Sequence, residues 1–282
     1  MSVRIITDSS ADLTPTEIRA LNVEVVPMTV RFGDRAYLDG VDLSKAEFYR
    51  LLAENKDDPA TAQPSPEDFL TRFRAVKAAG DQAVVLPVSG KLSGTLQSAA
   101  IAKELCEYEG IHIVDTLSAS AGVHLLAGHA CALRDRGATA GEIVAVLEEL
   151  KPRVRIFALI DTLEYLRRGG RLSNLQAGIG TVTKLKPVIS VREGAVMVVG
   201  KAFGAAAAMK QLLKFLSQHP VDNSFPAYAL YSDDESRVDD FIPRLTELDL
   251  LPKEVRRCSI GPTIGAHIGP GAVGMAYIET AP

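Results

Sequence analysis

Apolar and polar positions along the first half of the chain alternate between two periods, one typical of strands and one of helices. β-branched, apolar runs at Val3–Thr7 and Ala83–Val88 predict strands, and the second run is continuous, as a strand buried on both faces should be. A helical pattern follows at Thr95–Glu107, and Thr139 with Glu142 forms a capping box that starts another helix. Repeated strand–helix units of this kind predict a mostly parallel sheet.

The pattern changes after Pro152. Two β-rich runs, Pro187–Arg192 and Ala195–Val199, flank a short turn and predict a hairpin, and further strands and helices follow. Hairpins combined with helices favour an α+β domain with a mixed or antiparallel sheet. We therefore expect an α/β fold of two domains: a doubly wound, Rossmann-like domain over residues 1–152 and an α+β domain over residues 153–282. The length of 282 residues agrees, because a domain takes about 150 residues.

Composition narrows the possible functions. Hydrophobic residues make up 47% of the chain but aromatic residues only 6%, so the apolar content is mostly aliphatic and could form core or an oily cavity. The net charge of -4 gives no general support to nucleic-acid binding. Three distant cysteines favour neither a disulfide framework nor a zinc site. Because neither a signal peptide nor an apolar run of about 20 residues is recognisable, we expect a soluble, cytoplasmic protein.

The strongest candidate site is the loop Ser89–Thr95, which lies between a predicted strand and a predicted helix, where ligands bind in α/β sheets. Its two glycines allow a tight backbone path, and Ser93 and Thr95 supply hydroxyls at the helix start. This is a plausible cradle for a carboxylate or a phosphate. The loop matches neither a Walker A motif nor a G-x-S-x-G elbow. The alternative is that Ser93 merely caps the helix.

Two further segments carry polar groups of interest. Thr61 lies in a polar, proline-stiffened loop, where it could donate to a ligand oxygen. Arg167, Arg168 and Arg171 surround a Gly-Gly pair at a predicted helix end. They could recognise an anion, or they could simply interact with the helix dipole.

The segment Gly261–Gly271 contains four glycines and two prolines, which predicts an irregular, rigid loop. His267 is its one side chain that titrates near neutral pH, so we consider it a site candidate. Asp8 follows the first strand and could be an acid, a base or a metal ligand, but a turn cap is the favoured interpretation. We expect no metal site, because no H-E-x-x-H or comparable pattern is present.

These candidates belong to a set of seven segments that stand in order along the chain. They are Thr7–Leu13, Thr61–Pro66, Ser89–Thr95, Asp115–Thr116, Leu163–Arg171, Leu185–Val188 and the loop around His267. Taken together, they make the sequence resemble the DegV family, which are bacterial proteins that bind fatty acids. The resemblance runs almost from end to end.

The resemblance implies a carrier that holds one long-chain fatty acid and needs no other cofactor. The carboxylate would sit at the domain junction, and the tail would enter an apolar tunnel, mainly in the second domain. The positions matching the family's carboxylate-binding residues are Thr61, Ser93 and His267, with Gly94, Thr95 and Arg171 as supporting residues.

The family also implies a partner. A separate fatty acid kinase would convert the bound fatty acid into an acyl phosphate for phospholipid synthesis, so the carrier itself would not be an enzyme. Transient contact with a membrane or an acyltransferase is compatible with this role. Two positions depart from the family pattern: Ala62 stands where a serine is common, and Phe203 stands at or near the arginine used for docking the kinase. The second departure counts against the kinase partnership more than against lipid binding.

Two alternatives remain from the residues alone. A serine hydrolase or acyl transferase could use Ser93 with His267, and Asp8 is the one acid we could nominate to orient the histidine. A phosphosugar- or nucleotide-binding α/β protein is the weaker alternative, because G-x-G-x-x-G and Walker A motifs are absent.

Overall fold

The computed structural model describes residues 2–55, 57–172 and 185–281. A four-stranded sheet forms the base of the first half, and all its strand pairs are parallel, as the alternating pattern predicts. Its strand order is β2 (Val23–Val26), β1 (Val3–Asp8), β6 (Gln82–Leu86) and β7 (Ile111–Ile113).

Helices cover both faces of this parallel sheet. Successive residues of β1 point to opposite faces, so that Ile5 packs into one apolar cluster and Ile6 into another. The cluster around Ile6 includes side chains of α3 (Pro66–Ala79) and α4 (Thr95–Cys106). The cluster around Ile5 includes side chains of α5 (Ala121–Asp135) and α6 (Ala140–Leu150), and side chains of α1 (Pro15–Leu21) pack against it.

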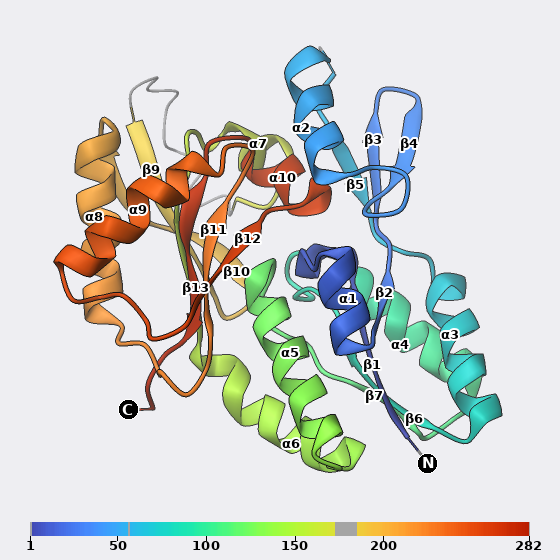
Figure 1. Cartoon of the computed structure of the whole chain (residues 1–282). Coiled ribbons are helices and arrows are strands. Elements are labelled where there is room, and N and C mark those ends of the chain that lie inside the picture. The colour runs from blue at the N-terminus through green and yellow to red at the C-terminus, as the bar shows by residue number, and fades with distance from the viewer. Residues whose placement is uncertain (1, 56, 173–184, 282) are drawn as a thin grey trace.

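A small antiparallel sheet, which the sequence pattern did not predict, stands above the parallel sheet (Figure 1). The segment around Thr61, expected as a loop, forms one of its strands and pairs with β3. Val30 and Phe32 of this sheet pack with α2 (Lys45–Glu54) around Phe48. The strand order is β4 (Arg35–Leu38), β3 (Thr29–Phe32) and β5 (Ala60–Ala62).

The second half is built on a six-stranded mixed sheet, which confirms the expected class. Among its described strands, β11 and β12 pair in parallel and the other neighbours are antiparallel. The predicted hairpin is β9 with β10, and both strands are longer than expected. The strand order is β10 (Ala195–Phe203), β9 (Leu185–Arg192), β8 (Val154–Leu159), β13 (Val273–Ile278), β11 (Ala227–Tyr231) and β12 (Val255–Ser259).

Helices α8 (Ala205–Gln218) and α9 (Ser236–Glu247) pack against one face of the mixed sheet. The other face shares one apolar cluster with α5, α6 and the parallel sheet, so α5 lies between the two sheets (Figure 1). The chain passes from α6 to β8 through a single 3-10 turn at Lys151–Arg153. The domain division at residues 152 and 153 stays a prediction.

Two short helices lie where the layers meet: α7 (Glu164–Arg168) and α10 (Pro262–Ile268). The expectation of an irregular loop around His267 was therefore wrong. Pro262 occupies the first turn of α10, where its missing N–H costs nothing, and Gly269 ends the helix with φ of 72°. Gly261, Pro262 and Gly269 thus mark the ends of a helix, and Gly265 lies inside it.

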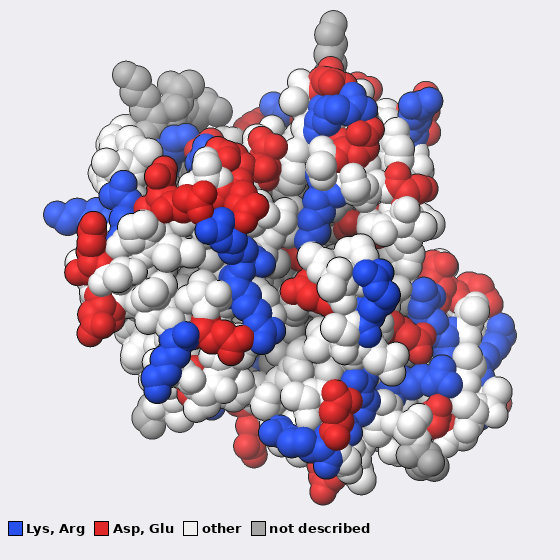
Figure 2. All heavy atoms as spheres, in the orientation of Figure 1, with Lys and Arg blue, Asp and Glu red and all other residues white. Residues whose placement is uncertain are grey.

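Positive and negative side chains are interspersed over the face shown in Figure 2. On the edge strand β12, for example, Arg256 pairs with Glu254, and Arg257 pairs with Glu235 and Asp239. The expectation from net charge that nucleic acid is not a general partner stays a prediction. No helix in the described part of the chain is long and apolar enough to cross a membrane.

Candidate functional site

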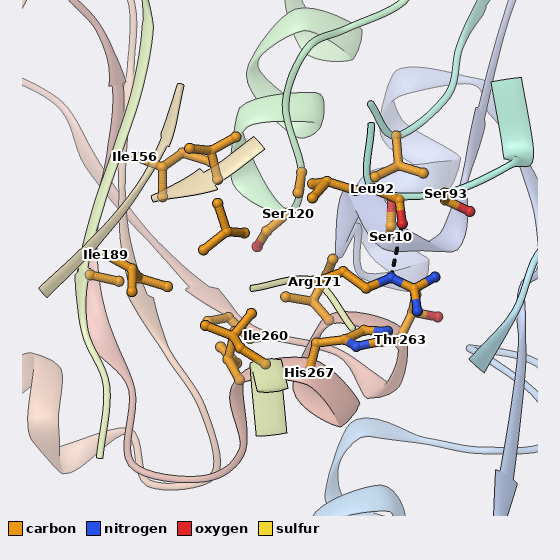
Figure 3. Close-up of a pocket in the computed structure, with 18 of the residues that line it drawn as sticks. Ser10, Leu92, Ser93, Ser120, Ile156, Arg171, Ile189, Ile260, Thr263 and His267 are labelled. Atoms are coloured by element: carbon orange, nitrogen blue, oxygen red, sulfur yellow. Dashed lines mark hydrogen bonds between the residues drawn. The ribbon is translucent and has the colours of Figure 1, made fainter. Parts of the chain in front are cut away.

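A cavity of about 780 Å³, part of it open to solvent, lies between the parallel sheet, the mixed sheet and α10. Aliphatic side chains such as Ile156 and Ile189 line one side, and polar groups of Ser93, Arg171 and His267 gather at the other (Figure 3). The cavity therefore has an apolar part and a polar end.

His267, from the last turn of α10, reaches the polar end beside β5. Its Nε2 and the Oγ1 of Thr61 are 2.9 Å apart, within hydrogen-bonding distance. Its Nδ1 is buried and has no hydrogen-bond partner among the described residues. Gly169 makes room for this ring, because a Cβ at that position would lie 2.2 Å from Nδ1. Burial, followed by the charge of Arg171, lowers the pKa of His267 to about 4, so the ring is neutral at pH 7.

Ser93 lies at the polar end but does not occupy the cap position of α4. The N-cap is Gly94, and no side chain caps this helix. Ser93 Oγ lies 2.8 Å from Thr95 Oγ1 and accepts a weaker bond from the N–H of Thr95 at 3.3 Å. The alternative that Ser93 merely caps the helix is therefore met only in part, because Ser93 accepts from the N–H of Thr95 without being the N-cap residue. Gly94 packs against Gln63 and Thr95 is buried, and neither is among the residues that line the cavity.

Arg171 lines the polar end and is held in place by two carbonyls. Its Nε donates to Leu92 O at 3.0 Å, and its Nη1 donates to Gly169 O at 2.6 Å. Arg167 and Arg168 of the same motif instead pair with Glu164 on the exposed side of α7. Of the three arginines, Arg171 alone is among the lining residues.

Three hydroxyls at the cavity escaped the sequence reasoning. Ser120 and Thr263 both line the cavity, and each donates to a buried carboxylate, Asp12 and Asp39 respectively, at 2.5 Å. The third is Ser10. A weak signal existed for Ser10, because it follows Asp8 in the loop after the first strand. Thr263 lies in the Gly261–Gly271 segment that already stood out, and no comparable signal marked Ser120.

Asp8 caps the turn after β1, as the favoured interpretation predicts. Its carboxylate accepts from the N–H of Ser10 at 2.9 Å and from the N–H of Val88 at 2.8 Å. Burial raises its pKa. In the part of the chain that the structure describes, no group of three or more histidine, cysteine or acidic side chains could hold a metal ion.

The hydrolase alternative requires a bonded chain from nucleophile to base to acid. Within the described residues, no hydrogen bond joins Ser93 to His267 or His267 to Asp8. Ser93 bonds to Thr95, His267 to Thr61, and Asp8 to backbone N–H groups. The geometry offers an anion a set of donors, without an assembled catalytic triad.

The chain matches a family of known proteins. Residues 2–280 match the family model described as "Uncharacterised protein, DegV family". A DegV domain-containing protein of Caldanaerobacter subterraneus subsp. tengcongensis is 32% identical over 277 residues, which cover 98% of this chain and 99% of that relative.

Solved structures agree in fold over nearly the whole chain. A DegV family protein from Thermus thermophilus, described by its fatty acid binding, is 34% identical with a TM-score of 0.89, covering 99% of this chain and 100% of that one. A stearic-acid-binding protein from Eubacterium ventriosum is 25% identical with a TM-score of 0.85, covering 99% and 98%. The chain described here therefore belongs to the DegV family.

Proposed function

We propose that this protein binds one long-chain fatty acid in the cavity, with the carboxylate at the polar end and the tail among the aliphatic side chains. The observation that carries the proposal is the division of a single cavity into a polar end with Ser93, Arg171 and His267 and an aliphatic remainder. The fatty acid binding of the Thermus thermophilus relative and the stearic acid binding of the Eubacterium ventriosum relative support it.

The energetics of such a ligand fit the two parts of the cavity. Each buried CH₂ of the tail contributes about 0.8 kcal/mol, so a long chain binds tightly without a charged clamp. A buried carboxylate is costly unless donors surround it. Thr61 and Ser93 offer hydroxyls, His267 a ring nitrogen and Arg171 a guanidinium. Gly94 and Thr95 contribute by shaping the turn that carries Ser93.

We further propose that the protein is a carrier and that a separate fatty acid kinase phosphorylates the bound carboxylate for phospholipid synthesis. Ser93 is only partly buried, which supports access to the carboxylate from outside. Phe203, at the end of β10, is 70% exposed and lacks the charge of the family's docking arginine. Ala62 is exposed and does not line the cavity, so the missing hydroxyl there does not weaken the lipid site.

The lipid-binding proposal is tested by denaturing the purified protein, extracting it and analysing the extract by mass spectrometry. We expect a co-purifying fatty acid, or one that exchanges in when the protein is incubated with fatty acids. Ser93→Ala and His267→Ala should each retain less lipid while keeping the wild-type circular dichroism spectrum. Unchanged affinity in both variants would show that the carboxylate binds elsewhere.

The carrier role is tested by two activity measurements. Saturable hydrolysis of a p-nitrophenyl ester, lost in Ser93→Ala, would favour the hydrolase alternative over a carrier. Lipid-loaded protein with ATP should form acyl phosphate only after a bacterial fatty acid kinase is added. If no acyl phosphate forms with the kinase present, the kinase partnership is wrong while lipid binding stands.

A further inference from the structure

Helix α10 belongs to the C-terminal half of the chain, yet both of its ends bond to the N-terminal half. Its last turn carries His267, which contacts Thr61 of β5. At its first turn, the N–H of Gly261 donates to Asp12 Oδ1 at 2.8 Å. Residues of α10 therefore line the cavity from a position that contacts with the first quarter of the sequence fix.

Asp12 joins two cavity walls through one carboxylate. It lies at the end of the short turn after β1, is only 2% exposed, and has φ of 57°. While Oδ1 accepts from Gly261, Oδ2 accepts from Ser120 Oγ at 2.5 Å. Ser120 immediately precedes α5 and lines the cavity. The carboxylate thus connects the start of α10 with the start of α5.

A second acid and two side chains of α2 reinforce this connection. Asp39 Oδ2 accepts from the N–H and the hydroxyl of Thr263, at 3.2 and 2.5 Å. Lys45 Nζ donates to the carbonyls of Asp12 and Ser259, both at 2.7 Å. Tyr49 donates its hydroxyl to Ile260 O at 3.0 Å. The segment from 259 to 263 is therefore bonded along its length to the N-terminal half.

We propose that Asp12 and Asp39 are positioning residues that hold α10 against the N-terminal half and thereby set how fast a fatty acid enters and leaves the cavity. Neither acid lines the lipid cavity; both line a separate cavity, to which Lys45 and Gly261 also contribute. They therefore act on the ligand through α10, whose Thr263 and His267 face Ser93 and the other residues of the N-terminal wall. This inference rests on the proposed function.

A positioning role differs from a contribution to affinity in its kinetics. A looser α10 opens the cavity more often, so the association and dissociation rate constants both rise while their ratio changes little. Loss of a direct contact, as in Ser93→Ala, raises mainly the dissociation rate constant. A role in overall stability alone leaves both rate constants of the folded protein unchanged.

The experiment is stopped-flow exchange of the fluorescent fatty acid cis-parinaric acid with the full-length protein. For Asp12→Ala we expect both rate constants to rise about tenfold, because two hydrogen bonds to a buried carboxyl group are lost. Asp12→Asn should stay near wild type, because its oxygen still accepts from Gly261 and its NH₂ can donate to Ser120. Asp222→Ala is the matched control: Asp222 also bonds one N–H and one side chain, but within the C-terminal half.

Two further measurements guard against ambiguous outcomes. If Asp12→Ala fails to fold, Tyr49→Phe removes the hydroxyl that donates to Ile260 O and should accelerate both rates in the same direction. Hydrogen exchange should speed up at the amides of α10 in these variants and not in Asp222→Ala. Unchanged rates and unchanged α10 exchange, or a rise in dissociation alone, would overturn the positioning role. A wild-type protein that binds no fatty acid would instead refute the proposed function.

Discussion

Replacing Gly169 by alanine would place a methyl group where the ring of His267 now lies. The new Cβ would be 2.2 Å from His267 Nδ1 and 2.8 Å from Cε1, distances at which something must move. The backbone itself tolerates alanine, because Gly169 has φ of -72°. The change therefore acts through a clash with His267 and adds no backbone strain.

The expected loss follows from the contact that the ring would leave. Moving the ring separates Nε2 from Thr61 Oγ1, now 2.9 Å away, and takes one donor from the carboxylate site. A hydrogen bond to a charged group is worth about 1.5–3 kcal/mol. Since about 1.4 kcal/mol is tenfold in Kd, we expect fatty acid binding to weaken about 10- to 100-fold.

A fluorescent fatty acid displacement assay measures this effect. Gly128→Ala is the control, because a Cβ at Gly128 on α5 would meet nothing within 4 Å. The sharper test repeats Gly169→Ala in a His267→Ala background, where the clash is absent and no further loss should follow. An equal loss in both backgrounds would refute the reasoning, because the methyl group would then act on something other than His267.

Three more predictions concern the tail, the histidine and the buried acid. Val196 lines the cavity, so Val196→Phe should fill part of it and weaken binding of the longest fatty acids about fourfold for each CH₂ displaced. Met197→Phe is the control and should not weaken binding, because Met197 is 40% exposed and does not line the cavity. In an NMR titration, the pKa of His267 should rise from about 4 when a fatty acid binds, because the carboxylate favours the charged ring; an unchanged pKa would place the carboxylate elsewhere. Burial raises the pKa of Asp12 to about 7, so the folded state keeps a proton that the unfolded state releases between about pH 4 and 7. As the pH rises through this window, the free energy of unfolding of the wild type should therefore fall relative to that of Asp12→Asn. Urea titrations at pH 5 and pH 8 measure both values, and a difference that does not change with pH would contradict the raised pKa.

Local signals in the sequence predicted the elements that depend on local interactions. The capping box of Thr139 with Glu142 starts α6 as expected, because both of its hydrogen bonds lie within four residues. The continuous apolar run at Ala83–Val88 overlaps a buried strand of the parallel sheet, β6 (Gln82–Leu86). Hydrophobic periodicity and helix-capping motifs each report on a single segment. They therefore predict the elements whose structure depends on interactions within that segment.

Tertiary packing determines the elements that the sequence pattern predicted wrongly. Gly265 brings α10 so close to α2 that a Cβ there would lie 2.7 Å from the ring of Phe48. Ala266 joins the apolar cluster of the small sheet. The small residues that suggest a loop when α10 is considered alone are therefore those that let it pack as a helix. Likewise, β5 exists because β3 pairs with it, and β3 is distant in sequence.

The three arginines of the segment Leu163–Arg171 show that a sequence can indicate a site without indicating which residue faces it. Arg167 and Arg168 lie one turn from Glu164 on α7, so the helix itself provides their partner. Gly170 then turns the chain with φ of 69°. After this turn Arg171 points back toward the cavity, where its guanidinium lies beside His267 (Figure 3). The sequence places three equivalent charges together, and the glycine between them determines which one faces the proposed carboxylate.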